Sequence, residues 1–426
     1  MNKKYIIPDY LLSAFDENGN LVIYNTLYYN TFIVKRADVD SFKKICENIV
    51  AKGTCDPQYM NFLLDHNFIV DENYDIHTAL ASKYVETFMS KKILSLIILP
   101  TEKCNFKCLY CYEDHNHGKM SKECIDRILT LLNKLMPEYD MLNISWFGGE
   151  PLLEIGIIEY IMTHAQQICK LHKKPIYSMI TTNGYLLDTD IMQKLLKLHI
   201  MKFQITLDGN RTTHNYNRPH INGGNTYDVI LNNLLDIKRK IKTKTIQIII
   251  RINVGMSTTS DEINDIASNF HDDSRFVINI QRIFGSSKPD TLSETSHTKY
   301  FDLIRNCNEY LSDELTSDNT VCYAAKENTL MVRADGSLGK CTVNFNDPSN
   351  YFGNIKDINI DSFDLSKLSY CNSIITDKCI RCRIYPLCFG RQCPARRNQI
   401  CDQLIEKYRI HIKNNSMQAI IWDMHK

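Results

Sequence analysis

The sequence predicts an α/β fold in which parallel strands, each followed by a helix, form a partial βα barrel between two further domains. Three observations lead to this prediction. Strand and helix patterns alternate six times in the middle of the chain, cysteines gather in two arrays, and residues 1–92 follow a different pattern from the rest. Repeated βα units imply parallel strands joined by right-handed crossovers. A chain of 426 residues is long enough for a barrel-sized domain with additions.

Residues 1–92 are expected to form a winged-helix-like domain. Two short strand patterns follow a turn at Asn18-Gly19-Asn20, two helical patterns come next, and a brief apolar run then suggests a wing. In chain order these segments are Leu21–Tyr24, Phe32–Lys35, Asp38–Ala51, Asp56–Asp65 and Phe68–Val70. A further helical pattern, Thr78–Ser90, connects this domain to the next.

Residues 93–290 are expected to form the (β/α)6 barrel, which resembles an incomplete TIM barrel. The predicted strands are Leu94–Leu99, Leu142–Phe147, Ile176–Thr181, Lys202–Leu207, Ile246–Val254 and Phe276–Ile283. Helical patterns between them include Lys122–Leu135, Ile155–Leu171, Asp190–Leu198 and Tyr227–Ile241. In such barrels the chemistry lies on the loops after the carboxyl ends of the strands.

Residues 300–426 are expected to form a third, loop-rich domain. A helical pattern at Tyr300–Leu315 leads into a cysteine-rich segment, and a helical tail follows Asp402. Few hydrophobic runs occur between Cys322 and Cys401. A region with so little core material is expected to depend on bound metal for its structure.

Composition excludes several classes of protein. The 50 basic and 49 acidic side chains nearly balance, so no general attraction to nucleic acid or to an anionic membrane is expected. No signal peptide and no apolar run of the roughly 20 residues that span a membrane is present, which predicts a cytoplasmic protein. Because a reducing cytosol disfavours disulfides, the clustered members of the 16 cysteines are expected to bind metal.

Cys104, Cys108 and Cys111 directly follow the first predicted barrel strand. Offsets of four and seven also mark one face of a helix, so a buried helical stripe is the alternative. As ligands, three thiolates leave one iron of a [4Fe–4S] cluster open. The Cys-x3-Cys-x2-Cys pattern, with the aromatic Tyr110 before its last cysteine, resembles the radical S-adenosylmethionine (radical SAM) superfamily. The resemblance implies that S-adenosylmethionine binds the open iron and is split into methionine and a 5′-deoxyadenosyl radical.

Polar residues at later strand ends are candidates for binding this cofactor. Gly148 and Gly149 allow close approach to the backbone, and the Glu150 carboxylate can accept from an ammonium group, although an ordinary βα turn before Pro151 is the alternative. The resemblance assigns this Gly-Gly-Glu motif to the methionyl amino group. It assigns Thr182, Asn183 and Asp208, together with Tyr110, to the same cofactor site, although plain turns or helix caps are the alternative for the three strand-end residues. Arg251 and Asn253 lie near the end of the fifth strand, where a charged residue is unusual, so they are expected in this site unless they point outward toward a helix.

The second cysteine array resembles the SPASM extension, which binds auxiliary [4Fe–4S] clusters. The resemblance assigns one auxiliary cluster to Cys379, Cys382, Cys388 and Cys401, and the other to Cys322, Cys341 and Cys393. The Cys388-x4-Cys393 step is one residue longer than the usual family spacing. The inner cluster then takes a fourth ligand from Cys307 or Cys371, or it keeps an open site. Zinc is the alternative metal, since Cys-x2-Cys pairs also build zinc ribbons.

The combination resembles the radical SAM maturases of ribosomally made peptides. The expected partners are a precursor peptide, whose leader adds a strand to the winged-helix-like domain, and a flavodoxin- or ferredoxin-type reductant. The expected reaction is oxidative and forms a thioether or a carbon–carbon crosslink. One alternative is an anaerobic sulfatase-maturing enzyme that makes formylglycine. Another is an iron–sulfur regulator whose winged helix binds DNA, although the near-neutral charge disfavours nucleic acid.

Overall fold

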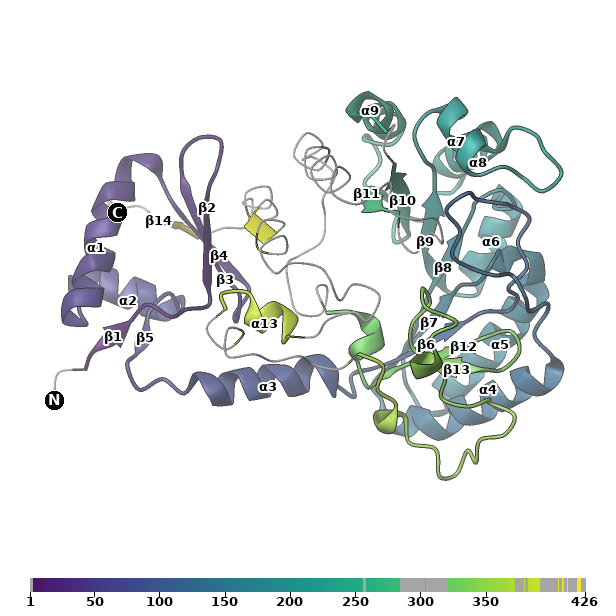
Figure 1. Ribbon diagram of the computed structural model, residues 1–426, viewed down its shortest axis with the longest axis horizontal. Coiled ribbons are helices and arrows are strands. Elements are labelled where there is room, and N and C mark those ends of the chain that lie inside the picture. The colour runs from purple at the N-terminus through teal and green to yellow at the C-terminus, as the bar shows by residue number, and fades with distance from the viewer. Residues whose placement is uncertain are drawn as a thin grey trace. The chain divides into compact units, whose positions relative to one another are not determined.

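The computed structural model divides the chain into two compact units (Figure 1). It describes residues 3–255, 258–283, 303, 321–371, 379, 382–390, 405, 408–409, 412 and 420–422. The barrel unit comprises Ser90–Tyr310 and Lys326–Tyr370. The terminal unit comprises Met1–Met89, Leu311–Ala325 and Cys371–Lys426, so it joins the two ends of the chain.

Six parallel strands in chain order form the centre of the barrel unit, which confirms the predicted fold class. They are β6 (Ile93–Ile98), β7 (Met141–Trp146), β8 (Ile176–Thr182), β9 (Ile200–Thr206), β10 (Gln247–Val254) and β11 (Phe276–Arg282). In β10 the isoleucines at 248, 250 and 252 are completely buried. Strand order equals chain order because each helix returns the chain to the same edge of the growing sheet.

Helices follow the strands at the places where the sequence supplies a cap. Ser121, Asp188 and Asn225 each accept hydrogen bonds from the first turn of a helix, and Thr259 forms a capping box with Glu262. The helices of this unit are α4 (Lys122–Leu135), α5 (Ile155–Leu171), α6 (Thr189–Lys197), α7 (Arg211–Asn217), α8 (Thr226–Lys240) and α9 (Ser260–Ser268). Short 3-10 turns, η2 (Met136–Glu138) and η3 (Pro151–Glu154), flank β7.

Residues 326–370 extend this sheet, although the sequence analysis placed them in the C-terminal domain. Strand β12 (Thr329–Val332) pairs in parallel with β6, and β13 (Leu338–Gly339) pairs antiparallel with β12. Two 3-10 turns, η6 (Pro348–Asn350) and η7 (Leu365–Lys367), follow. The Arg127 side chain of α4 donates a 2.9 Å hydrogen bond to the carbonyl of Ile355, which ties this segment to the barrel.

The terminal unit contains an antiparallel sheet from the first residues of the chain, with one further strand from its far end. Its antiparallel sheet consists of β2 (Leu11–Phe15), β3 (Leu21–Asn25) and β4 (Asn30–Val34), and β14 (Ile420–Trp422) pairs in parallel with β4. Strand β1 (Tyr5–Ile6) pairs with β5 (Val70–Asp71), the predicted wing. The remaining elements are η1 (Arg36–Asp38), α1 (Val39–Lys52), α2 (Pro57–Asp65), α3 (Ile76–Phe88), η5 (Tyr323–Ala325) and α13 (Tyr385–Cys388).

Both faces of this antiparallel sheet are buried. Ile23 and Phe32 pack on one face with residues of α1 and α2. Val22 and Tyr24, on the opposite face, pack with a set from the C-terminal part of the chain that comprises Ile384, Leu387, Tyr408 and Ile412. The Thr26 hydroxyl adds a 2.7 Å hydrogen bond to the carbonyl of Arg383. The sheet is therefore sandwiched between the first helices and the C-terminal segment, whereas a free winged helix has one open face.

Some expected elements lie outside the described residues. These are the predicted helix at Tyr300–Leu315, including Cys307, and the cysteines Cys393 and Cys401. Across the part of the chain that is described, none of the helices has both the length and the apolar content needed to cross a bilayer.

Candidate active site

The loop Cys104–Cys111 is held in place by a strand-like ladder to residues 217–221. Lys107 N donates to the carbonyl of Pro219 and Leu109 N donates to that of Asn217, each at 2.9 Å. Phe106 and His220 also form an isolated antiparallel bridge. Because the loop has no helical turns, the alternative of a buried helical stripe does not apply. The extended ladder is followed by a turn, in which Cys111 N donates to the Cys108 carbonyl at 3.1 Å, and together they bring the three cysteines to one cavity.

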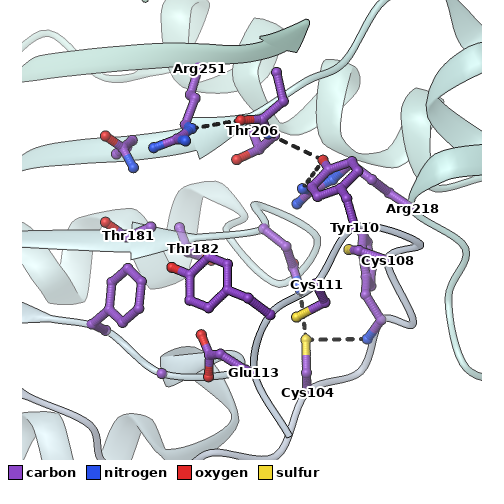
Figure 2. Close-up of a pocket in the computed structure, with 18 of the residues that line it drawn as sticks. Cys104, Cys108, Tyr110, Cys111, Glu113, Thr181, Thr182, Thr206, Arg218 and Arg251 are labelled. Atoms are coloured by element: carbon purple, nitrogen blue, oxygen red, sulfur yellow. Dashed lines mark hydrogen bonds between the residues drawn. The ribbon is translucent and has the colours of Figure 1, made fainter. Parts of the chain in front are cut away.

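Cys104, Cys108 and Cys111 line a single cavity of about 150 Å³ at the carboxyl ends of the parallel strands (Figure 2). Burial raises the pKa of the Cys104 thiol to about 12, and it also raises the pKa of Cys108 and of Cys111. Thiols in such surroundings keep their protons unless a metal ion replaces them. Three thiol groups around one cavity, with no fourth thiol from the described residues, fit a [4Fe–4S] cluster with one open iron.

Arg218, at the end of α7, also lines this cavity, and it was not among the predicted site residues. Its guanidinium donates to the Tyr110 hydroxyl at 2.8 Å, while its Nε is buried and has no partner among the described residues. Burial by itself lowers the pKa of Arg218, but the neighbouring acidic groups of Cys108, Tyr110 and Asp208 raise it overall. A buried donor without a partner is costly, so an anionic group in this cavity would complete the site. An iron–sulfur cluster carrying thiolate ligands meets that requirement.

Gly148 and Gly149 bring the β7–α5 connection against the cysteine loop. A Cβ atom at Gly149 would lie 2.4 Å from the Glu102 carbonyl oxygen and 2.5 Å from that of Lys103. Gly148 has a φ of +119°, and a Cβ there would lie 2.3 Å from the Thr101 carbonyl oxygen. Both positions therefore exclude a side chain, and both glycines line the cavity.

Glu150 does not line the cavity and is completely buried. Its carboxylate accepts hydrogen bonds from Leu152 N at 3.0 Å, Thr182 Oγ1 at 2.8 Å and Asn183 N at 2.8 Å. The structure thus places Glu150 behind the cavity wall, where it fixes the end of β8. Thr182 and Asn183 themselves line the cavity, and Asn183 Nδ2 donates to Asn105 Oδ1 of the cysteine loop at 2.7 Å.

Tyr110 is the centre of a buried polar network at the other side of the cavity. Its hydroxyl donates to Asp208 and accepts from Asn253 Nδ2 at 3.2 Å. Asn253 N donates to Asp208 Oδ1 at 2.7 Å, and Arg251 Nε donates to Asn253 Oδ1 at 2.9 Å. Tyr110, Arg251 and Asn253 line the cavity, whereas Asp208 is buried behind them. Asp208 therefore braces the network, which ties the ends of β9 and β10 to the cysteine loop.

Two residues just after the cysteine loop, Glu113 and His115, also line the cavity. The Nδ1 of His115 lies 2.7 Å from the Glu102 carbonyl oxygen, and its Nε2 lies 3.4 Å from Cys111 Sγ. His115 has a φ of 54°, an uncommon backbone conformation for a residue other than glycine. Sequence reasoning missed both residues, as well as Gln204 and Thr206 on β9. Their positions in the sequence could have indicated them. Glu113 and His115 come directly after the third cysteine, and Gln204 and Thr206 alternate at the end of a strand.

A buried ion pair supports the base of the cysteine loop. Arg333, which follows β12, donates from Nε and Nη2 to the two carboxylate oxygens of Glu102, each at 2.9 Å. Both side chains are largely buried, at 14% and 3% exposure. The bidentate geometry fixes the backbone just before Cys104 relative to β12.

The described cysteines of the second array are distributed over both units. In the terminal unit, Cys382 N donates to the Cys379 carbonyl at 3.0 Å, and Cys388 ends α13. Besides burial, the charges of Cys379 and Cys388 raise the pKa of Tyr385, which lies between them in the sequence. Cys322 and the buried Cys371 belong to the terminal unit, and the buried Cys341 belongs to the barrel unit.

Residues 98–270 match the Radical SAM superfamily, so this part of the chain is a radical SAM domain. An uncharacterised protein of Methanocaldococcus jannaschii is 32% identical over 133 residues, which cover 30% of this chain and 43% of that protein. The chain thus spans less than half the length of this relative. The radical SAM cyclopropyl synthase TigE of Paramaledivibacter caminithermalis is 23% identical over 361 residues, which cover 75% of this chain and 71% of TigE.

Among solved structures, anSMEcpe with bound S-adenosylmethionine and a peptide shares the fold. The two chains are 20% identical with a TM-score of 0.57, over 76% of this chain and 99% of anSMEcpe. The resemblance to the radical SAM superfamily inferred from the first cysteine motif is therefore confirmed, and Cys104, Cys108 and Cys111 lie within the matched residues.

Proposed function

We propose that this protein is a radical SAM enzyme that oxidatively modifies a ribosomally made precursor peptide. The observation that carries the proposal is the cavity in which three cysteine thiols meet polar residues from successive strand ends. The proposed resident group is a [4Fe–4S] cluster on Cys104, Cys108 and Cys111 that binds S-adenosylmethionine at its open iron. When bound and reduced, this pair supplies a 5′-deoxyadenosyl radical that abstracts a substrate hydrogen atom.

The proposed tasks of the protein are to position the cofactor and exclude water. Thr182 and Asn183, fixed by Glu150, present polar groups from β8, while Arg251 and Asn253 do so from β10. Gly148 and Gly149 let the β7–α5 connection pack directly against the cysteine loop at the cavity wall. Fixed polar groups in a cavity with little water hold a reactive group in one geometry and protect it from side reactions.

A peptide substrate is supported by two independent features. The structure of anSMEcpe, which shares the fold with this chain, contains a bound peptide. The terminal unit also offers an open sheet edge, because no strand among the described residues pairs with the outer edge of β2. An extended leader peptide can add to such an edge through main-chain hydrogen bonds. Because a cyclopropane ring contains a new carbon–carbon bond, the similarity to a cyclopropyl synthase favours carbon–carbon bond formation over a thioether.

The cysteine array of the terminal unit is proposed to hold an auxiliary [4Fe–4S] cluster on Cys379, Cys382, Cys388 and Cys401. A second auxiliary cluster is proposed on Cys322, Cys341 and Cys393. Together the two clusters would supply an acceptor and an exit path for the one electron that the substrate radical releases. A flavodoxin- or ferredoxin-type protein is the proposed reductant. Iron and sulfide analysis tests the assignment, since three [4Fe–4S] clusters require about twelve iron atoms per chain whereas zinc sites contain no sulfide.

The test is the production of 5′-deoxyadenosine from S-adenosylmethionine by the anaerobically reconstituted, reduced protein. The wild type is expected to produce it, and Cys104→Ala is expected to abolish production. Mass spectrometry of a precursor peptide encoded nearby, after co-expression, then identifies the modification. A mass loss consistent with a crosslink supports a maturase, whereas formylglycine in a sulfatase peptide supports the sulfatase-maturing alternative. Absence of 5′-deoxyadenosine together with specific DNA binding would support the regulator instead.

A further inference from the structure

A buried arginine lies beside the cysteine loop. Lys107 N and Leu109 N donate to the carbonyls of residues 219 and 217, and this antiparallel register places Arg218 directly opposite Cys108. Residues directly opposite each other in such a pair project to the same face, with Cβ atoms about 5 Å apart. Both side chains line the cavity (Figure 2). The ladder therefore brings a cationic group next to one of the three proposed cluster ligands.

The surroundings of Arg218 leave its charge poorly screened. Arg218 is only 7% exposed. Its Nη1 donates to the Tyr110 hydroxyl at 2.8 Å, and its guanidinium carbon lies 5.9 Å from the centre of the Phe106 ring. A guanidinium group stays protonated inside a protein. Because water and salt screen buried charges much less than exposed ones, this charge acts strongly on its neighbours.

Asp208 is the acidic member of the same buried network. Its carboxylate accepts from the Tyr110 hydroxyl and from Asn253 N, and it lies behind the cavity lining. Burial raises the pKa of the Cys108 thiol, the charge of Arg218 opposes this rise, and the charge of Asp208 adds to it. The two charges therefore act on the cysteine with opposite signs, and only Arg218 lines the cavity.

We propose that the buried charge of Arg218 raises the reduction potential of the cluster held by the three-cysteine loop. This inference rests on the proposed function, because that function supplies the cluster. Reduction adds one negative charge to the cluster, and a fixed positive charge nearby favours the reduced state. The potential of an iron–sulfur cluster is set in part by the charges around it and by its exposure to solvent. With Arg218 in place, a flavodoxin- or ferredoxin-type donor reduces the cluster more readily.

The test measures the midpoint potential of this cluster in the anaerobically reconstituted full chain, without S-adenosylmethionine, by a redox titration followed by electron paramagnetic resonance. The signal of this cluster is the one that Cys104→Ala lacks, which separates it from the auxiliary clusters. Arg218→Gln removes the charge. At a fixed potential the ratio of reduced to oxidised cluster is expected to fall about 10- to 100-fold, equivalent to about 60–120 mV for one electron. Arg218→Lys keeps the charge and is expected to retain most of the wild-type potential.

Three further variants separate the charge from its hydrogen bond and from its helix. Tyr110→Phe removes the hydrogen bond of Arg218 but not its charge, and it is expected to shift the potential less than Arg218→Gln does. Arg211→Gln removes an exposed cation of α7 that is paired with Asp228, and it is expected to change nothing because exposed charges are screened. Asp208→Asn removes the opposing charge and is expected to raise the potential.

Iron content and visible absorption of each variant show whether the cluster is bound. An unchanged potential in Arg218→Gln with wild-type iron content would overturn the inference. An equal fall of the potential in Arg218→Gln and Asp208→Asn would also overturn it, because local packing rather than charge would then set the potential. If Arg218→Gln binds no cluster, a raised potential in Asp208→Asn supports the inference and a lowered or unchanged one refutes it. A wild-type chain that binds no [4Fe–4S] cluster would instead refute the proposed function, so the two failures are distinguishable.

Discussion

Replacing Gly149 with alanine should damage the cysteine loop without touching any cysteine. The added Cβ would lie 2.4 Å from the Glu102 carbonyl oxygen and 2.5 Å from that of Lys103, whereas ordinary contacts begin at 3.4 Å. The backbone just before Cys104 therefore has to withdraw by about 1 Å. Metal–ligand distances tolerate only about 0.2 Å. A shift of this size moves the Cys104 sulfur out of ligand range unless the loop deforms elsewhere, and the overpacking itself costs about 1–3 kcal/mol.

The assay for this prediction is iron bound per chain after anaerobic reconstitution, together with thermal unfolding. Gly149→Ala is expected to lose the iron of one cluster and to unfold at a lower temperature than the wild type. Gly156→Ala is the matched control, because nothing lies within 4 Å of a Cβ at that position in α5. Alanine there should stabilise the helix by about 0.5–1 kcal/mol. Equal iron content and equal stability in the two variants would refute the close-packing argument.

Three further predictions follow from buried contacts. Arg333→Lys replaces a bidentate ion pair with a single contact to Glu102. The free energy of unfolding, measured with denaturant, should therefore fall by about 1–3 kcal/mol. An unchanged unfolding midpoint would mean that the ion pair does not hold the loop. Burial lowers the pKa of His214 to about 2, below its unfolded value of 6.5, so the folded state resists protonation and stability is lost as the pH falls below 6.5. Between pH 6.5 and 5, His214→Asn should remove up to about 2 kcal/mol of this loss in the free energy of unfolding. If the free energy of unfolding falls equally with pH in both proteins, His214 is not the group responsible. Cys382→Ser should increase hydrogen exchange in β2 and β3, since the segment after Cys382 covers one face of their sheet; unchanged exchange there would show that the sheet is stable without the metal.

The parallel sheet was predictable because its signals are local and repeated. The apolar strand patterns and the capped helices alternate six times, and each signal concerns residues adjacent in the chain. The location of the cavity could be predicted from the same alternation, because parallel strands bring their carboxyl ends to one edge of the sheet. Cys104, Gly149, Asn183 and Asn253 come from four different strand ends and meet there. Topology alone brings such residues together.

The roles of individual carboxylates were not predictable in the same way. Glu113 directly follows the cysteine loop, whereas Glu150 belongs to the Gly-Gly-Glu motif after the second strand, and only that motif marked a carboxylate as a candidate. Which one lines the cavity depends on donors far away in the chain, such as Thr182 for Glu150. Strand β12 was missed for a similar reason, because its pairing with β6 joins segments more than 200 residues apart. No local pattern encodes a contact of that kind.

The alternation within β3 links the two ends of the chain physically. Ile23 faces α1 and α2, while Val22 and Tyr24 face the segment that carries Cys382. Neither face of the sheet can be exposed without uncovering large apolar side chains, and such exposure is costly. Tyr84 and Phe88 of α3 add edge contacts to Phe389, just beyond Cys388. A metal that orders the Cys379–Cys388 segment therefore also orders the sheet with the open β2 edge. If the leader binds at that edge, the affinity for leader peptide should depend on the loading of the auxiliary cluster.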